Sequence, residues 1–150
     1  GGSSVNGQVI ANGDTVAKPT TPTYVNHGFA GWYTSPTFEA DTKYDFSTNV
    51  TGDLKLYARW FLWGDVNGDG NANSMDALLI NRCRIGAINY SDLKYAIAAR
   101  VNDVTNTTPN SMDALLINRH RIGAIAIYPV ETQTAGYEFD LESNTFITNK

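Results

Sequence analysis

The chain has 150 residues, of which 42% are hydrophobic and 17% charged, and its formal net charge is -4. This length suits one ordinary domain or two small ones, and the composition is typical of a soluble folded protein. No apolar run approaches the roughly 18 residues that span a membrane, and the basic residues are scattered among acids. These features exclude membrane insertion and give no surface for nucleic acid, and we expect a monomer in isolation.

The first residues do not resemble a secretory signal. The start, Gly-Gly-Ser-Ser, lacks the basic and apolar regions of a secretory signal, so we expect the sequence to begin after a removed signal or at a cut inside a longer protein. The single Cys83 rules out an internal disulfide, which says nothing about the compartment.

Short β-type stretches broken by Gly, Pro, Asn and Asp fill the first 60 residues and predict a β-rich module over 1–62. Residues 54–60 alternate cleanly, which predicts a strand with Leu54, Leu56 and Ala58 on its buried face. Aromatic residues should supply much of the core, and we favour this over a sugar-stacking platform because so small a module has little else to bury. They are Phe29, Trp32 and Tyr33.

The stretch SMDALLINRCRIGAI, residues 74–88, recurs as SMDALLINRHRIGAI, residues 111–125, with Cys83 replaced by His120. Asn73 or Ser74 can cap the first copy and Gly86 can end it, so each copy predicts a helix. We expect the repeated apolar residues to pack: Leu78, Leu79 and Ile85, with Leu115, Leu116 and Ile122 in the second copy.

Two further segments complete the expected architecture. Ser91 is a good N-cap and predicts a middle helix over Asp92–Val101, so that a three-helix domain spans 63–128. The extension 129–150 alternates as a strand or hairpin would, although a frayed terminus is the alternative. We predict that it packs on the first module with Tyr137, Phe139 and Leu141 facing inward, because an uncovered sheet edge is normally protected.

A calcium loop is predicted directly before the first copy. Ca²⁺ takes about 6–8 oxygen ligands, and an EF-hand-type loop supplies them at alternate positions with Gly at position 6 and an acid at position 12. Residues 65–76 fill these positions with oxygen-bearing side chains and place Gly70 at the turn. The predicted ligands are Asp65, Asn67, Asp69, Asn71 and Asp76, with Asn73 acting through water.

The second loop departs from this pattern. Counting back from Asp113 as position 12 gives a weak or vestigial site formed by Asn102, Asn106, Thr108 and Asp113, with Val104 in place of a ligand. Aligning the shared Val-Asn instead needs a two-residue insertion and puts Arg100 where the first loop has Asp65. Both registers leave too few carboxylates for a full site.

A half-hand duplicated about 37 residues apart resembles the dockerin family, whose calcium-stabilised modules plug enzymes and scaffold proteins into cohesin domains of cellulosome-like, polysaccharide-degrading assemblies. GDVNGDGNANSMDALLINRCRIG and its partial duplicate ARVNDVTNTTPNSMDALLINRHRIG carry the resemblance. It implies calcium as cofactor, a secreted or cell-surface bacterial location and a cohesin partner. The implied contact residues are Ser74, Met75, Asn81 and Arg82, mirrored by Ser111, Met112, Asn118 and Arg119. Two equivalent faces imply docking in either of two orientations, while recent duplication without selection on the surface is the alternative.

The first module is similar to the bacterial surface repeat named for Listeria and Bacteroides. The stretches GFAGWYT, YDFSTNVT and LKLYARW carry that similarity, which implies a β-grasp-like fold and a surface or spacer role, although the usual first strand is missing. The fold class is therefore α+β.

Catalysis has no support, because no nucleophile has a matched base and the acids of 65–76 serve better as ligands. We expect His120 to be an exposed helix residue and Cys83 to be inert. The leading interpretation is a calcium-dependent module that docks its parent protein onto a cohesin. A calcium-rigidified spacer or adhesin segment is the alternative, and a calcium sensor is the least favoured because one good half-hand offers no paired opening motion.

Overall fold

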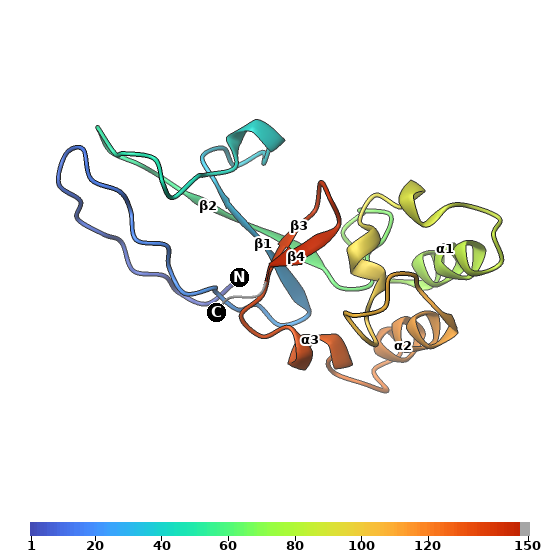
Figure 1. The fold of residues 1–150 in the computed structure, drawn as a ribbon. Coiled ribbons are helices and arrows are strands. Elements are labelled where there is room, and N and C mark those ends of the chain that lie inside the picture. Colours follow the sequence, from blue (N-terminus) through green and yellow to red (C-terminus); the bar gives the residue numbers. More distant parts are fainter. Residues whose placement is uncertain (148–150) are drawn as a thin grey trace.

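A computed structural model describes residues 1–147 and shows the predicted α+β architecture (Figure 1). A long β1–β2 hairpin lies at one end, α1 and α2 lie at the other, and a short β3–β4 hairpin lies between them (Figure 1). The principal elements are β1 (His27–Tyr33), β2 (Tyr57–Leu62), α1 (Ser74–Arg84), α2 (Ser111–Arg121), α3 (Pro129–Gln133), β3 (Glu138–Asp140) and β4 (Thr145–Ile147). In this part of the chain, no helix is both long and apolar enough to cross a membrane.

The β1–β2 pair is antiparallel and is interrupted by a bulge between Phe29 and Trp32. Gly31 sits in that bulge with φ of +102°, a conformation that a side chain disfavours. Strand β2 begins three residues later than the sequence predicted and continues to Leu62, while Leu54 is exposed. Phe61 extends the strand because its buried ring packs against Trp63.

The other β-type stretches of the first module form loops rather than regular strands. One bridge, between Thr15 and Asn49, ties the loop of residues 1–26 to the segment before β2. Both polar groups of the Gln8 side chain bond to the backbone of Ala17 across that loop. The loop contains Gly, Pro and Asn residues that favour turns over a continuous ladder.

Helices α1 and α2 form where the repeat predicts them, and both begin at a capping box. The Asn73 side chain accepts the Met75 N–H, while Asp76 accepts the Asn73 N–H. The same reciprocal pattern at Asn110 opens α2. Gly86 and Gly123 follow the two helices with φ of +75° and +77°, the left-handed conformation that ends a helix.

The middle segment differs from the prediction. In place of a helix over 92–101, it forms two 3₁₀ turns, Tyr90–Asp92 and Ala96–Ala99. Its backbone groups bond to other parts of the fold: the Tyr95 N–H donates to the Val66 carbonyl, and the Ala98 carbonyl accepts the Gly64 N–H. These tertiary hydrogen bonds take the groups that a continuous helix would need.

A single hydrophobic core joins the two ends of the molecule. Helices α1 and α2 contribute Ile80 and Ile117, the middle segment contributes Ile97, and the β1–β2 hairpin contributes Phe61, all nearly fully buried. Phe139 of the C-terminal extension belongs to the same cluster. The core is therefore continuous across the two predicted modules.

The C-terminal hairpin packs on the first module, which confirms the predicted docking of the tail. The Phe139 ring lies 5.3 Å from the rings of both Phe61 and Trp63, and Leu141 is buried. Tyr137 is partly buried and stacks on Phe146 at 5.4 Å. Strand β3 pairs with β4 and lies against β1 without joining its sheet, so the tail covers the hairpin by side-chain packing.

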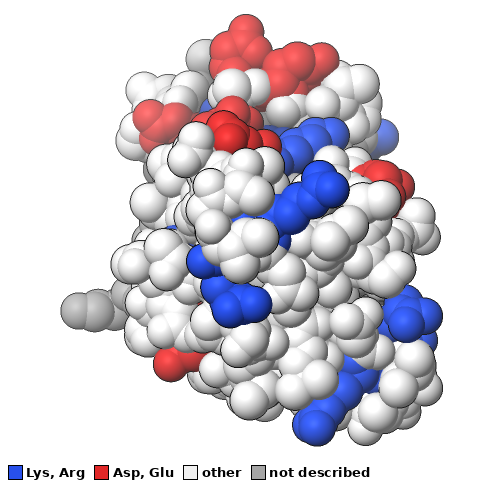
Figure 2. Space-filling model, turned by 90° about the vertical axis from the view of Figure 1, so that its right-hand side faces the viewer, with Lys and Arg blue, Asp and Glu red and all other residues white. Residues whose placement is uncertain are grey.

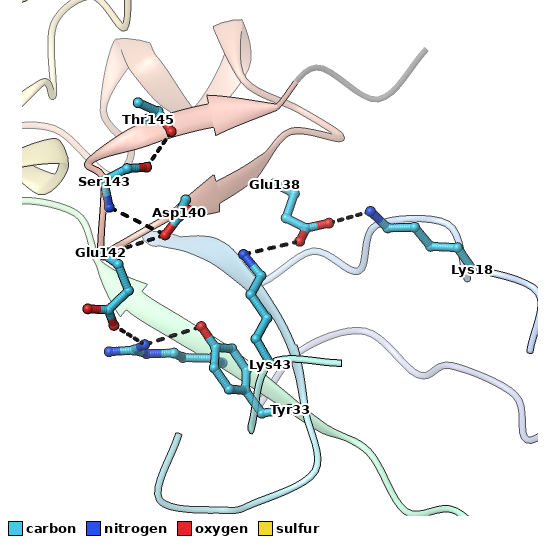
Figure 3. A network of polar contacts seen from close by, with 9 residues as sticks. Lys18, Tyr33, Lys43, Glu138, Asp140, Glu142, Ser143 and Thr145 are labelled. Carbon is cyan, nitrogen blue, oxygen red and sulfur yellow. Dashed lines mark hydrogen bonds and ion pairs between the residues drawn. The ribbon is translucent and has the colours of Figure 1, made fainter. Parts of the chain in front are cut away.

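Ion pairs reinforce this contact (Figure 3). The buried carboxylate of Glu138 lies 2.7 Å from the Lys18 ammonium and 3.9 Å from that of Lys43. Arg59 reaches both the Tyr33 hydroxyl and the Glu142 carboxylate. The alternation in the sequence places Glu138 on the exposed side of the strand, so its burial was not predicted. The two lysines compensate for the buried negative charge.

Candidate functional site

The first loop is folded around the Asp65 carboxylate. Oδ1 accepts the N–H groups of Gly68 and Asp69, at 2.7 and 3.2 Å, and Oδ2 accepts the Gly70 N–H at 2.9 Å. Both glycines have positive φ, of 72° and 89°, so glycine is needed to turn these amides toward the acid. The Asp69 side chain accepts the Asn71 N–H, which extends the turn toward α1.

Asp76, in the first turn of α1, closes the loop from the other side. Its fully buried side chain accepts the N–H groups of Val66 and Asn67 on Oδ1, at 3.0 and 3.3 Å, and that of Asn73 on Oδ2. Burial raises the pKa of the Asp76 carboxyl despite these bonds, and the nearby negative charge of Asp65 adds to the increase.

The first loop fits a cation by its charge. Two buried carboxylates, Asp65 and Asp76, lie close together, and no ion pair between the described residues involves either of them. Buried charge without a cationic partner is costly, and a divalent ion would compensate for it. Within 1–147 no group of three or more His, Cys, Asp or Glu side chains is placed to hold a metal ion, so Asp65, Asp69 and Asp76 do not converge in this structure. Amide and carbonyl oxygens, which the predicted ligands Asn67 and Asn71 carry, would therefore have to complete the site.

The second loop is closed around Asp113, which is also fully buried. Its oxygens accept the N–H groups of Asn102 and Asn110, at 3.0 and 2.8 Å. The structure thus brings Asn102 and Asp113 together, whereas Thr108 is exposed and Asn106 is half-buried in a separate turn.

Asp76 and Asp113 accept equivalent hydrogen bonds, so the two loops can be aligned on them. Asn102 donates to Asp113 as Asn67 donates to Asp76. This correspondence agrees with the register that aligns the shared Val-Asn. In that register Arg100 takes the place that Asp65 has in the first loop.

The predicted partner-binding residues lie on matching surfaces of α1 and α2. Ser74, Met75 and Arg82 are exposed and Asn81 is half-buried, and each second-copy residue has the same burial class. Exposed apolar residues recur with nearly equal fractions in both copies: Met75 52% and Met112 44%, Leu78 44% and Leu115 43%, Ile85 70% and Ile122 68%.

Leu78 and Ile85 are therefore surface residues, as are Leu115 and Ile122, and the prediction that these four pack was wrong. Ala77 and Ile80 face the core instead. Leu116 is buried and Leu79 packs partly buried against the core, as predicted. Met75, Leu78, Arg82 and Ile85 follow one another at intervals of three, four and three residues, which places them on one helix face. This spacing groups the residues of one face in the sequence but does not tell which face is buried. We call this set the α1 face and its counterpart, Met112, Leu115, Arg119 and Ile122, the α2 face.

The charge on both helices is basic where it is exposed. The acids Asp76 and Asp113 are buried, while Arg82 and Arg84 of α1 are exposed, as are the equivalent Arg119 and Arg121 of α2. Figure 2 views the molecule from the helical end and shows basic side chains separated by uncharged surface, with acids gathered at the upper edge. A partner with apolar and acidic groups would complement this end of the molecule.

The one position that distinguishes the repeats contacts the rest of the protein. His120 is half-buried rather than exposed: its ring stacks on Tyr128 at 4.6 Å, and Nε2 lies 3.2 Å from the Asn26 side-chain amide. Cys83, at the equivalent position of α1, is partly buried, and burial, with a smaller effect from Asp92, raises the pKa of its thiol. A raised pKa disfavours the reactive thiolate, in line with the expected inert cysteine.

Comparisons with known proteins find matches for both parts of the chain. Residues 1–59 match the Listeria-Bacteroides repeat domain. Two solved structures of complexes from Acetivibrio cellulolyticus, each of the third cohesin ScaC with a ScaB dockerin mutated in its N-terminal or its C-terminal helix, contain a similar chain. Identity is 36% in both, over 48% and 47% of this chain and 97% and 96% of that chain, with TM-scores of 0.43 and 0.42. No curated protein sequence matches the chain.

On the basis of that identity over nearly the whole of the smaller chain, the part of this chain that matches belongs to the dockerin family, and residues 1–59 match a Listeria-Bacteroides repeat. Dockerin membership implies calcium binding in general. Both matched modules are non-catalytic, and together they indicate an extracellular or cell-surface bacterial protein.

Proposed function

We propose that this protein attaches its parent protein to a cohesin domain, in a calcium-dependent manner, through the α1 face or the α2 face. The observation that carries the proposal is the pair of matching exposed apolar stripes on helices of a dockerin-like chain. Apolar residues beside arginine are the usual anchors of protein interfaces. The related ScaB dockerin is seen in complex with a cohesin, which supports the same class of partner here.

Calcium would be held by the five first-loop residues predicted from the sequence: Asp65, Asn67, Asp69, Asn71 and Asp76. When bound, the ion would neutralise the two buried carboxylates of the loop. Since Asp76 is both a ligand and part of the α1 capping box, an ordered loop would fix the first turn of α1. The α1 face begins at Met75 in that turn, so calcium would support the docking surface by holding its helix in place.

Two docking orientations follow from the equality of the two faces. A pseudo-twofold that exchanges α1 and α2 would present Met75, Leu78 and Arg82 or their counterparts in the same arrangement. The second face does not lie under the β module, because Met112, Leu115 and Ile122 are as accessible as their first-copy equivalents. We infer that the cohesin can use either face.

The β module of residues 1–62 would act as a spacer fixed rigidly to the docking domain of residues 63–128. Its contact with the C-terminal extension 129–150 and the continuous core support one rigid body. A calcium-rigidified structural segment without a cohesin partner remains the second candidate, because the same packing would suit a stalk.

Binding to cohesins separates the two candidates. The chain would be titrated against a panel of purified cohesins, including the ScaC third cohesin, in millimolar calcium and in chelator. We expect saturable binding to one cohesin in calcium and its loss in chelator. Val9→Asp, a control at a fully exposed apolar residue of the β module, should bind as the native chain does. Absence of binding to every cohesin in calcium would contradict the docking function and leave the spacer.

A further inference from the structure

We propose that the second loop is closed by the protein's own side chains, Arg100 and Gln133, in place of a metal ion, so that the chain takes up one Ca²⁺. The sequence predicted a weak or vestigial site there. The inference rests on the proposed function only for the calcium site of the first loop.

A second hydrogen bond supports the correspondence between the loops. The carbonyls of Val66 and Val101 each accept a backbone N–H from outside their loop, from Tyr95 and Val130 respectively, both at 3.1 Å. The two valines are also both fully buried. The residue before each valine therefore has the same place in the fold, and in the second loop that residue is Arg100.

The polarity of the two loops is opposite at this position. In the first loop the side chain of Asp65 accepts the N–H of Asp69, four residues further on, at 3.2 Å. In the second loop Nη1 of Arg100 donates to the carbonyl of Val104, also four residues further on and at 3.2 Å. The first loop turns amides toward an anion, and the second turns a carbonyl toward a cation. A fixed guanidinium thus supplies the positive charge that a bound cation would otherwise supply.

The Arg100 side chain is held in this position from its other end. Nε donates to the Tyr90 hydroxyl at 3.3 Å, and that hydroxyl donates to the Ala96 carbonyl. The guanidinium keeps its charge at any pH that a protein tolerates. It therefore opposes the entry of a second cation into this loop.

Gln133 of α3 closes the opposite side of the loop. Its Oε1 accepts the Val104 N–H at 3.1 Å, and its Nε2 donates to the Asn102 carbonyl at 2.9 Å. The Val104 side chain is buried at the position where the first loop has the Asp69 carboxylate. One amide side chain and one apolar side chain thus occupy places that would otherwise offer oxygen to an ion.

The remaining acids do not rebuild a calcium site. Asp113 is buried and bonded to backbone N–H groups. Asp103 turns to Thr105, whose hydroxyl and N–H both donate to its carboxylate. One inward carboxylate, in a loop that also holds a guanidinium, does not fit a hard divalent cation, which binds several anionic oxygens.

The two docking helices should then depend on calcium unequally. Helix α2 begins at the loop that Arg100 and Gln133 close, so it should stay formed without calcium. Helix α1 begins at the loop that needs the ion. At low calcium only the α2 face would be preformed, and calcium would add the second orientation.

Hydrogen exchange of the full chain, in calcium and in chelator, tests this inference without any cohesin. We expect chelation to speed exchange across 65–77 by about tenfold or more and to leave 100–114 within about threefold. Arg100→Ala should speed exchange across 100–114 in both conditions, and calcium should not restore it. Arg121→Ala, an exposed arginine of the same half, is the matched control and should change neither loop.

Loss of protection in both loops on chelation would overturn the inference, as would an Arg100→Ala chain that exchanges like the Arg121→Ala control. If Arg100→Ala does not fold, Gln133→Leu removes the other closing group with little change in volume and should give the same local result. A first loop that does not respond to calcium would contradict the proposed calcium site. In that case protection of 100–114 in chelator would still support the second-loop inference, and loss of that protection would still contradict it.

Discussion

The two half-hands of this protein share nearly the same helix but close their loops by different means. The first loop arranges amides around Asp65, whereas the second places Arg100 at the same position and bonds it to a carbonyl. The α1 and α2 faces nevertheless have almost equal exposure. Metal binding therefore cannot be the reason why the helices agree, and a shared partner surface explains the identity of their exposed residues better than core packing does.

The largest expected effect comes from removing both faces. Leu78→Asp together with Leu115→Asp should weaken cohesin binding by roughly 5 kcal/mol, because buried apolar anchors are lost in both orientations. Either substitution alone should cost only about twofold in affinity, the statistical loss of one of two equivalent modes. Calorimetric titration of the cohesin measures all three chains, with Val9→Asp as the control. A large loss from one single substitution would show that one orientation dominates.

Removal of the first-loop acids should have the next largest effect, on stability. With free calcium near 1 mM and a dissociation constant near 1 µM, binding linkage stabilises the folded state by about 4 kcal/mol. Asp65→Ala with Asp76→Ala should lower the melting temperature in calcium about as much as chelation lowers that of the native chain. The equivalent change in the second loop, Asp113→Ala, should lower the melting temperature equally with and without calcium. If calcium raised the melting temperature of Asp113→Ala by a different amount from that of the native chain, the proposed difference between the loops would be contradicted.

A smaller effect should come from the contact that joins the docking domain to the β module. Phe139→Ala removes a buried ring that packs on Phe61 and Trp63, and should destabilise the protein by about 3 kcal/mol. Truncation after Val130 should in addition speed hydrogen exchange in β1, where β3 packs. An unchanged denaturation midpoint for Phe139→Ala would mean that the tail contributes little to the rigid body.

The smallest effect should come from equalising the repeats at their single difference. His120→Cys removes the stacking on Tyr128 and the contact with Asn26, and should cost about 1 kcal/mol or less of stability. Cohesin affinity should not change, because position 120 faces the β module and not the α2 face. A change in affinity larger than about twofold would place His120 in the interface.

Features carried by local patterns could be predicted from the sequence. The capping residues at Asn73 and Asn110 set the starts of both long helices, and glycines set their ends, so α1 and α2 form as predicted. The alternation around Phe139 predicted the C-terminal strand and the burial of Phe139 and Leu141, but not the burial of Glu138. The first loop could be proposed as a calcium site because the spacing of its oxygen-bearing side chains is local.

Features that depend on distant partners could not be predicted. The segment around Ile97 was expected to be helical, but bonds from its neighbours to Val66 and Gly64 hold it in 3₁₀ turns. The exposure of Leu78 depends on which face of α1 packs against α2, and the spacing of the apolar residues alone did not determine that face. The bonds made by Gln133 to the second loop join residues about 30 positions apart along the chain, and no local signal announces them.

The most direct test of the central contrast is the number of calcium ions that the intact chain binds. Isothermal titration of the calcium-stripped protein with Ca²⁺ should give a stoichiometry of one, and Asp65→Ala with Asp76→Ala should abolish the signal. A stoichiometry of two would contradict the account, because it would show that Arg100 does not keep a cation out of the second loop.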